Sequence, residues 1–304
     1  MAPDRTTDPF SPEAATARSV PSQGSKGARL RLIAMGLTIV ACLCVGFLLT
    51  ISVVGQLRQS RDQKVAFDDF RYDLANGTAP VAQVSLEGVQ APLGATMGVM
   101  SIPSIGLRQV VFNGTTAGVM VSGPGLRRDS YLPGQAGTSI IYGRRAAFGG
   151  PFGSIDTLAP GAAIVVTTGQ GDAGYVVVAV RRAGDPIPPP AKIGRLTLIT
   201  ADGSPYAPSG LLIVDADLDT EPQPADPPLP RAAMEAAELP LAGDNSAWIG
   251  VLLWAQAALV VAVLVTLAWV RWNRWEAWVI GVPIMLAVGI ALSAHVALLM
   301  PNLM

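Results

Sequence analysis

The side chains best suited to nucleophilic or metal chemistry are scarce in this chain of 304 residues, which has two Cys and one His. A thiolate beside an imidazole is a common catalytic nucleophile, and Cys and His are the usual ligands of structural zinc. Cys42 and Cys44 lie in an uncharged run between Arg31 and Arg58, and His295 lies in another apolar run. We therefore expect no Cys–His pair, no metal and no cofactor in the polar middle of the chain.

The elements that hold these three residues are predicted to be membrane helices. Half of all residues are hydrophobic, 14% are charged, and the mean hydropathy is +0.43. The uncharged run at 32–57 exceeds the roughly 20 residues that a helix needs to cross a bilayer. Two further runs, at 245–270 and 277–300, flank a turn at 271–276 and predict a helical hairpin. We expect three spans, with the cysteines and His295 as packing residues inside them.

Charges beside the predicted spans indicate their orientation, because cytoplasmic flanks are enriched in Lys and Arg. Basic residues precede the first span and occupy the turn of the hairpin: Lys26, Arg29, Arg31, Arg271 and Arg274. The segment 217–244 instead carries seven acidic residues and one Arg, which suits the outer face of a membrane. This pattern predicts a multi-pass protein of the cell membrane with a cytoplasmic N-terminus and an extracytoplasmic middle.

The polar segments around the predicted spans are predicted to be tails and linkers. Residues 1–28 are rich in Pro, Ser, Thr, Ala and Gly without apolar periodicity, which is typical of a disordered tail. Residues 58–92 begin with charged positions and apolar residues at helical spacing, which predicts an extracytoplasmic stalk. The acidic, Pro-rich segment 219–244 predicts an extended linker. A net charge of −1 and the lack of a long basic run exclude nucleic acid as an expected partner.

Residues 93–218 are predicted to form an outer domain of mainly β structure. Runs such as RQVVFNG, GTSIIYG, AAIVVTTG and RLTLITADG alternate with turns rich in Gly and Pro. Seven or eight short strands at this spacing indicate a compact barrel or sandwich. The expected fold class is therefore mainly β, with three membrane helices added.

Read together, IPSIGL, VVFNGTT, LPGQAGTSIIYG, RRAAFGGPFG and RLTLIT resemble the sortases, more closely the class E and F types of Gram-positive actinobacteria. The resemblance covers residues 93–218 and implies an eight-stranded β-barrel that works at the cell surface as a cysteine transpeptidase. In that family a Cys attacks the sorting signal, a His protonates the leaving amine, and an Arg stabilises the oxyanion. The matching positions hold Arg144 for the His, Ala201 for the Cys, and Leu211, or Gly210, for the Arg. The spacing resembles the family's, but all three side chains differ.

A sortase-like barrel without these side chains is predicted to be a pseudoenzyme. We expect it to bind an extended peptide, or a surface or membrane protein, in the former catalytic groove. The candidate groove-binding residues flank the replaced positions: Tyr142, Arg144, Arg145, Thr200, Asp202 and Ser204. Because Arg144 takes the place of the His, its side chain is expected to point into the groove.

Two other functions stay open. A transpeptidase or hydrolase could use Thr200 or Ser204 as its nucleophile, or Asp202 with Asp215 or Asp217 as an acid pair, although such positions beside turns are usually exposed. The three helices could instead be the working part, in a subunit of a transport or secretion complex with the barrel as its outer receptor.

Other basic side chains of the outer domain are predicted to be solvated surface charges. They are Arg127, Arg128, Arg181, Arg182, Lys192 and Arg195. The alternative is an anionic ligand held by arginine forks near the mouth of the groove. For Lys192, a second role would be as the base of a hydroxyl nucleophile.

Overall fold

The computed structural model describes residues 37, 44–84, 88–190, 192–225, 227–271 and 274–304. The predicted tail 1–28, and residues 32–36 and 38–43 of the first predicted span, lie outside them. Contacts divide the chain into the units Met1–Val45 and Gly46–Met304. All elements named below belong to the second unit.

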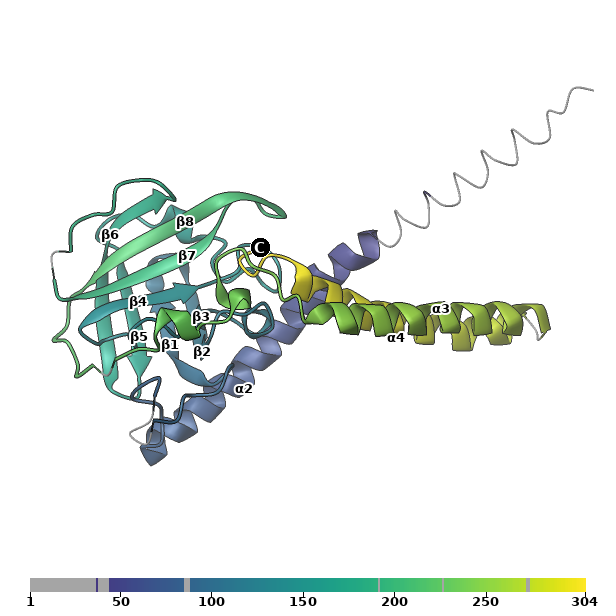
Figure 1. Ribbon diagram of the computed structural model, residues 1–304, viewed down its shortest axis with the longest axis horizontal. Coiled ribbons are helices and arrows are strands. Elements are labelled where there is room, and N and C mark those ends of the chain that lie inside the picture. Colours follow the sequence, from purple (N-terminus) through teal and green to yellow (C-terminus); the bar gives the residue numbers. More distant parts are fainter. Residues whose placement is uncertain (1–36, 38–43, 85–87, 191, 226, 272–273) are drawn as a thin grey trace, which may run out of the picture. The chain divides into compact units, whose positions relative to one another are not determined.

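Eight strands form a closed barrel (Figure 1). Their bounds are β1 Thr96–Ile102, β2 Leu107–Asn113, β3 Gly125–Leu126, β4 Gly137–Tyr142, β5 Ala163–Thr168, β6 Gly171–Arg182, β7 Gly194–Ser204 and β8 Ala207–Leu218. Around the barrel the order is β1-β2-β3-β4-β7-β8-β6-β5, and the pairs β2/β3 and β4/β7 are parallel. The predicted eight-stranded barrel is confirmed, and the sandwich is excluded.

The alternation of side chains along each strand separates the barrel core from the outer faces of the sheet. On β7, Leu196 and Leu198 belong to the main core, together with Val214 of β8. Ile199 and Ala201 lie an odd number of residues from Leu196 and Leu198, so they face the other side of the sheet. There they belong to a second apolar cluster. Strands β7 and β8 are buried on both faces along much of their length, which explains their nearly continuous apolar sequences.

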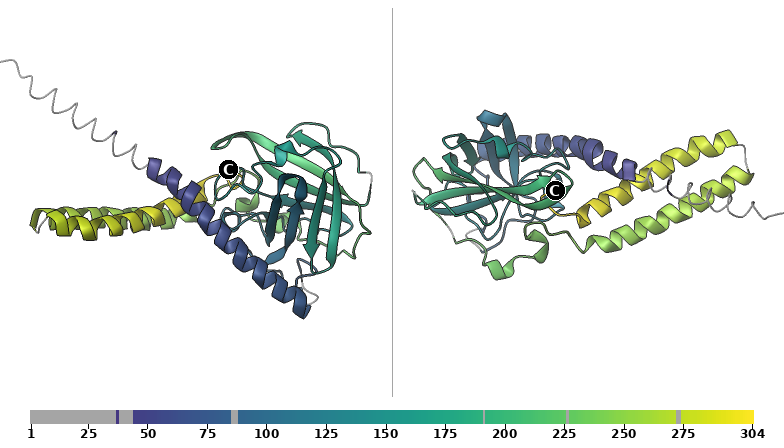
Figure 2. Two further views of the ribbon diagram at one scale, coloured as in Figure 1. Left: turned by 180° about the vertical axis from the view of Figure 1, so that it is seen from behind. Right: turned by 90° about the horizontal axis from the view of Figure 1, so that it is seen from above.

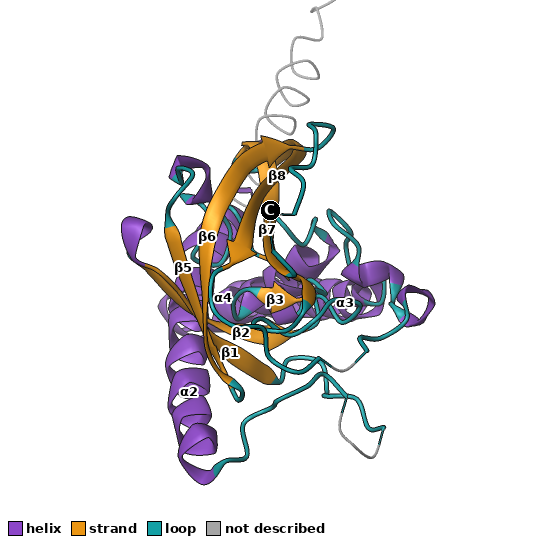
Figure 3. Ribbon diagram, turned by 90° about the vertical axis from the view of Figure 1, so that its left-hand side faces the viewer, coloured by secondary structure: helices purple, strands orange, loops and turns teal. Residues whose placement is uncertain are grey.

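Helix α2, Gly55–Asn76, lies along the barrel beside β1 and β2 (Figure 3). Its residue Phe70 is 1% exposed and packs with Val99, Val110 and Phe112. A π-helical stretch, η1 Thr50–Val54, precedes it. The helical part of the region predicted as a stalk is thus packed on the folded domain. The short 3₁₀ helices are η2 Pro103–Ile105, η3 Val119–Val121, η4 Ile155–Thr157, η5 Arg231–Ala233 and η6 Ala236–Glu238.

Helices α3, Ala247–Arg271, and α4, Arg274–Leu299, run side by side as a hairpin (Figures 1 and 2). Within the described residues, two helical stretches are long and apolar enough to cross a membrane by length and composition, Ala247–Ala268 and Val279–Leu299. The described part of the N-terminal helix does not supply a third. Two apolar helices therefore support membrane association, and the three predicted spans remain a prediction.

The hairpin packs closely at its only histidine. A Cβ on Gly250 of α3 would lie 2.2 Å from Cδ2 of His295 on α4, so the glycine makes room for the imidazole ring. The Nδ1 atom of His295 lies 2.9 Å from the Ala291 carbonyl oxygen, and the ring centroid lies 6.3 Å from that of Trp254. These contacts are those of a residue used in helix packing.

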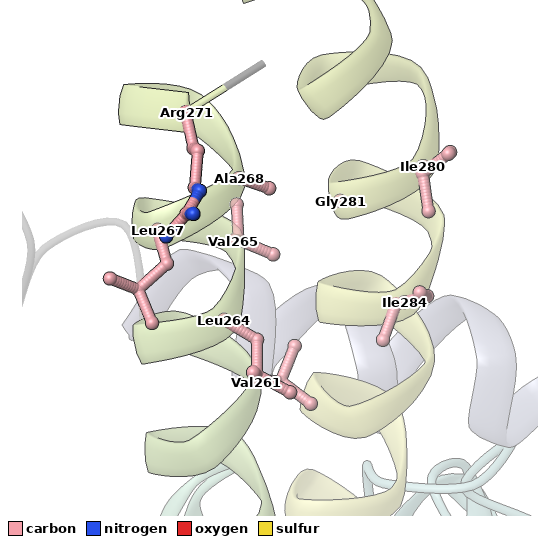
Figure 4. Close-up of a pocket in the computed structure, with 9 residues that line it drawn as sticks. All are labelled: Val261, Leu264, Val265, Leu267, Ala268, Arg271, Ile280, Gly281 and Ile284. Carbon is pink, nitrogen blue, oxygen red and sulfur yellow. The ribbon is translucent and has the colours of Figure 1, made fainter.

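A groove of about 450 Å³ lies between α3 and α4 (Figure 4). Its walls include Val261 and Leu264 of α3 and Ile284 of α4, and Arg271 lies at one end. The apolar lining matches the hydrocarbon surroundings expected of two membrane-crossing helices. This groove belongs to the hairpin and holds none of the predicted site residues.

Candidate functional site

The positions that the resemblance matches to the family's catalytic residues, Arg144, Ala201 and Leu211, lie on or beside neighbouring strands of the barrel. The parallel register of β4 and β7 pairs Tyr142 with Ile199, so Arg144, two residues beyond Tyr142, follows alongside Ala201. The antiparallel register of β7 and β8 pairs Ala201 directly with Leu211. The topology therefore brings together the positions of Arg144, Ala201 and Leu211, which are far apart in the sequence.

These strands share an outward apolar surface, which we call the β4–β7–β8 face. It consists of Ile140, Tyr142, Ile199, Ala201, Leu211 and Ile213. Met120, Leu241 and Leu303 pack onto it. Because of this cover Ala201 is 1% exposed, and Leu303 is 0% exposed. The predicted groove is filled by the chain itself at the position where the resemblance places a nucleophile.

The cover is fastened by residues 301–304, which follow α4 and which we call the 301–304 segment. The backbone amide of Arg145 donates to the Leu303 carbonyl oxygen at 3.1 Å, and the Asn302 amide donates to the Ala242 carbonyl oxygen at 2.9 Å. The Asn302 side-chain amide donates to the carbonyl oxygens of Thr115 at 2.8 Å and Leu239 at 3.0 Å. The segment is held by polar bonds on both sides of a buried leucine.

Arg144 is 1% exposed and its guanidinium is solvated by the backbone. Its Nε donates to the Met120 carbonyl oxygen and its Nη2 to that of Ala117, both at 3.1 Å. Its Cζ lies 4.9 Å from the centroid of the Phe148 ring, and no carboxylate of the described residues forms an ion pair with it. Burial lowers the pKa of Arg144 to about 10, so the group stays charged at neutral pH. Arg144 thus binds the carbonyl oxygens of the 117–120 loop, and its expected role as a groove-binding residue stays a prediction.

Comparisons with known proteins show what the barrel is similar to. Residues 100–219, less than half of the chain, match the family model described as Sortase domain. The matched residues are similar to a sortase domain. The sequence matches no curated protein. Among solved structures, the chain is similar to sortase E of Streptomyces avermitilis, with 28% identity over 49% of this chain and 100% of that one and a TM-score of 0.38.

Two more solved structures show similarity of the same order. SrtF sortase of Corynebacterium diphtheriae is 23% identical over 49% of this chain and 94% of that one, with a TM-score of 0.38. A Clostridium perfringens sortase D5 transpeptidase is 20% identical over 53% of this chain and 99% of that one, with a TM-score of 0.42. The similarity to the sortases rests on the match of residues 100–219.

Two of the candidate residues border the covered position, Tyr142 at the end of β4 and Arg145 three residues beyond it. Tyr142 is 1% exposed, and burial raises the pKa of its phenol. Its oxygen accepts a hydrogen bond from Arg127 at 3.4 Å. Arg145 donates from Nη1 to the Ala201 carbonyl oxygen at 3.0 Å and forms an ion pair with Asp156 at 3.4 Å. Both residues hold the β4–β7–β8 face together.

The other three candidates on β7 do not meet at one point. Thr200 is 0% exposed, lies out of phase with Ala201, and its hydroxyl has no hydrogen-bond partner among the described residues. Asp202 forms an ion pair with Arg182 at 2.8 Å, and this hydrogen bond lowers the pKa of the carboxyl. Ser204 is exposed in the β7–β8 hairpin. Neither hydroxyl has a base beside it in the described part of the chain.

The basic side chains that we predicted to be solvated are all paired with carboxylates. Arg182 and Lys192 are 70% and 50% exposed, as predicted, whereas the side chains of Arg127, Arg128, Arg181 and Arg195 are at most 13% exposed. The pairs are Arg127–Asp129, Arg128–Glu238, Arg181–Asp215 at 2.6 Å, Arg182–Asp202 at 2.8 Å, Lys192–Asp219 at 2.5 Å and Arg195–Asp217 at 2.8 Å. Asp215 is 1% and Asp217 is 5% exposed, which corrects the expectation that they face solvent. Each positive charge is balanced locally, which leaves little net charge for an anionic ligand.

Metal chemistry finds no support in the described residues. No three His, Cys, Asp or Glu side chains come together there in a way that could hold a metal ion. The buried carboxylates Asp215, Asp217 and Glu238 are already engaged by arginines.

The 301–304 segment was not identified from the sequence. Its residues PNLM follow an apolar run, and only Pro301 indicates that the helix ends before them. Met120 and Leu241 were also missed, because an apolar residue between the strands gives no sign of what it covers. Their role depends on tertiary contacts between regions far apart in the chain.

Proposed function

We propose that this chain is a membrane-anchored, non-catalytic sortase-domain protein that acts as a binding and assembly module on the outer surface of the cell membrane. One observation carries the proposal. Ala201, which takes the position of the family's nucleophile, is 1% exposed and belongs to the same apolar cluster as Leu303, itself fully buried. A methyl group has no lone pair with which to attack a carbonyl, and a covered position has no room for a substrate.

A replacement nucleophile is disfavoured by the direction of the strand. Because side chains alternate across a sheet, Thr200 faces away from the surface that presents Ala201 and Leu211. Ser204 is the exposed last residue of β7, at the β7–β8 turn, and Lys192 is engaged by Asp219. A serine or threonine needs a base within hydrogen-bond reach, and neither has one among the described residues.

The replacement of the family's His also supports the proposal. A general acid must exchange a proton near the operating pH, and a guanidinium with a pKa of about 10 holds its proton throughout the neutral range. The Arg144 donors point to two carbonyl oxygens of the 117–120 loop, where they stabilise the covered state. We therefore assign Arg144 a structural role, that of holding the 117–120 loop in place.

The membrane setting follows from charge and hydropathy. Two helices are apolar enough to span a bilayer, and Arg271 and Arg274 lie at the turn between them. Basic flanks are enriched on the inner side of a membrane, which supports an outer location for the other ends of α3 and α4 and for the sortase domain. Contacts of Ala297 and Leu298 with Ala147 and Phe148 keep the domain close to the membrane surface.

The experiment is a turnover assay on the full chain in detergent, with sorting-signal peptides and an amine acceptor. We expect neither cleavage nor transfer above the level of a Thr200→Ala, Ser204→Ala variant. Turnover by the natural chain that this double variant loses would overturn the proposal in favour of a hydroxyl nucleophile. Turnover that both proteins retain, and that survives repurification, would overturn it as well.

The hairpin supports a second candidate, a subunit of a multi-span transport or secretion complex. Anchoring requires one helix, whereas this chain has a hairpin with an apolar groove between α3 and α4. Co-purification of a multi-span partner that depends on residues 245–304, and survives replacement of the sortase domain, would favour this candidate.

A further inference from the structure

The 301–304 segment is buried on the β4–β7–β8 face as a bound peptide would be. Leu303 contributes a side chain that is 0% exposed, Asn302 contributes a fully buried amide, and Met304 is 5% exposed. The adjoining residues of α4 are only partly buried. Burial thus increases abruptly where the helix ends and the 301–304 segment reaches the sortase domain.

Three kinds of contact hold this segment, and each selects a different feature. The apolar surface around Ala201 and Tyr142 takes a branched aliphatic side chain. The Arg145 amide donates to a main-chain carbonyl oxygen, which any peptide offers. The carbonyl oxygens of Thr115 and Leu239 accept only from a donor, so they select the amide of Asn302 and reject a carboxylate. The site therefore recognises an Asn-Leu pair.

The walls of the site are fixed independently of the segment. Thr115 donates its hydroxyl to the Glu238 carbonyl oxygen at 2.8 Å, and the Glu238 carboxylate binds Arg128. Arg144 holds the loop at Ala117 and Met120 from the other side. The bonds of Thr115 and Arg128 join segments between the strands to Glu238 of η6, the bonds of Arg144 join two such segments to each other, and none of them involves the 301–304 segment. Such walls persist when the segment leaves.

We infer that the β4–β7–β8 face is a peptide-binding site for an Asn-Leu segment and that residues 301–304 of this chain are its resident ligand. The inference rests on the proposed assembly role for its setting only. If turnover were found, the assembly role would fail and peptide binding would stand, so the two can fail separately.

The test removes the resident ligand and supplies it again from outside. The full chain lacking residues 301–304 is titrated in detergent with a fluorescent peptide LMPNLM, and binding is followed by anisotropy. We expect saturable binding to the shortened chain and at least about tenfold weaker binding to the intact chain, whose site is occupied. Peptides with Asn302→Asp or Leu303→Asp should also bind the shortened chain at least about tenfold more weakly.

A matched pair of variants locates the site. In the shortened chain, Ala201→Phe places a ring where Leu303 packs and should abolish binding, whereas Ile193→Phe, at a residue 75% exposed, should not. Equal binding by the intact and shortened chains, or by both peptides and their Asp forms, would overturn the inference. So would absence of binding by a shortened chain that still unfolds cooperatively.

If the shortened chain does not fold, the inference is tested by crosslinking in the intact chain. Cys42→Ala and Cys44→Ala remove the native thiols, and Ala201→Cys with Leu303→Cys introduces two new ones. A short bifunctional maleimide should join this pair within one chain, and should leave the pair Ile193→Cys with Leu303→Cys unjoined. Equal joining of both pairs, or of neither in a folded protein, would overturn the inference.

Discussion

The outward surface of β7 and β8 has two halves that are closed by opposite means. In the first half, Arg195 lies opposite Asp217 and Thr197 lies opposite Asp215. In the second half, Ile199 lies opposite Ile213 and Ala201 opposite Leu211. Both halves are largely buried, one through ion pairs and the other through apolar packing.

The covers of the two halves also differ in origin. Arg195 donates to the carbonyl oxygens of Pro188 and Pro189, in the loop that leads directly into β7. The apolar half is covered by the 301–304 segment, from far along the chain. A local loop can close a polar surface during folding of the domain itself. A remote segment can close the apolar half only after the hairpin has docked, which makes that half the separable one.

The largest effect should come from the polar half, in Asp215→Ala. This change removes the carboxylate that binds Arg181 at 2.6 Å and Thr197 at 2.9 Å, and leaves a largely buried guanidinium without its partner. We expect the free energy of unfolding to fall by about 3 to 5 kcal/mol. Urea unfolding of the full chain in detergent measures it.

The matched control is Asp219→Ala, which removes the partner of Lys192. The side chains of that pair are 50% and 62% exposed, so the change should cost no more than about 1 kcal/mol. Equal losses for Asp215→Ala and Asp219→Ala would contradict the view that burial makes the polar half indispensable.

Next in size should be Leu303→Ala in the apolar half. Removing the end of a fully buried leucine costs about 2 to 4 kcal/mol when the site cannot collapse. Because the segment can also detach, we expect limited proteolysis near residues 300–304 to rise while cleavage within the barrel strands stays unchanged. Ile187→Ala, at a residue 70% exposed, is the control and should change neither stability nor cleavage. Barrel cleavage rising together with that of the segment would show that the two parts are not separable.

The smallest effect should be a pH dependence at Tyr142. Burial raises the pKa of this phenol in the folded protein above its unfolded value of about 10. Its contribution is therefore complete below about pH 10 and is lost as the pH rises toward the folded pKa, because the unfolded chain releases its proton first. The stability difference between the natural chain and Tyr142→Phe should be flat at neutral pH and shrink above about pH 10. A difference that stays constant or grows above that pH would contradict the assignment.

How far the sequence predicts this structure depends on whether the signal is local. Runs such as GTSIIYG and RLTLIT predict strands because the alternation and turn residues lie within each run, and the eight-stranded barrel follows from the resemblance. The two-residue strand β3 was missed because Gly125–Leu126 in a GPGL context carries no alternation. The hairpin helices were predicted from uninterrupted apolar length.

The candidate site was predictable in position and not in contacts. Arg144, Ala201 and Leu211 were identified through the resemblance. The register pairs Ala201 with Leu211 and ends at Tyr142, two residues before Arg144. The ion pair of Arg195 with Asp217 was missed, because recognising it requires the register of β7 against β8. The cover by Leu303 could not be predicted, since nothing near residue 303 in the sequence refers to residue 201.

The central claim is that the position of the missing nucleophile is closed by the 301–304 segment. In a chain with Cys42→Ala and Cys44→Ala, the thiol of Ala201→Cys reports on this directly through its rate of maleimide labelling. The account predicts labelling at least about tenfold slower than at Ile193→Cys, and a rise to a comparable rate once residues 301–304 are removed. Labelling of Ala201→Cys in the intact chain as fast as that of Ile193→Cys would contradict it.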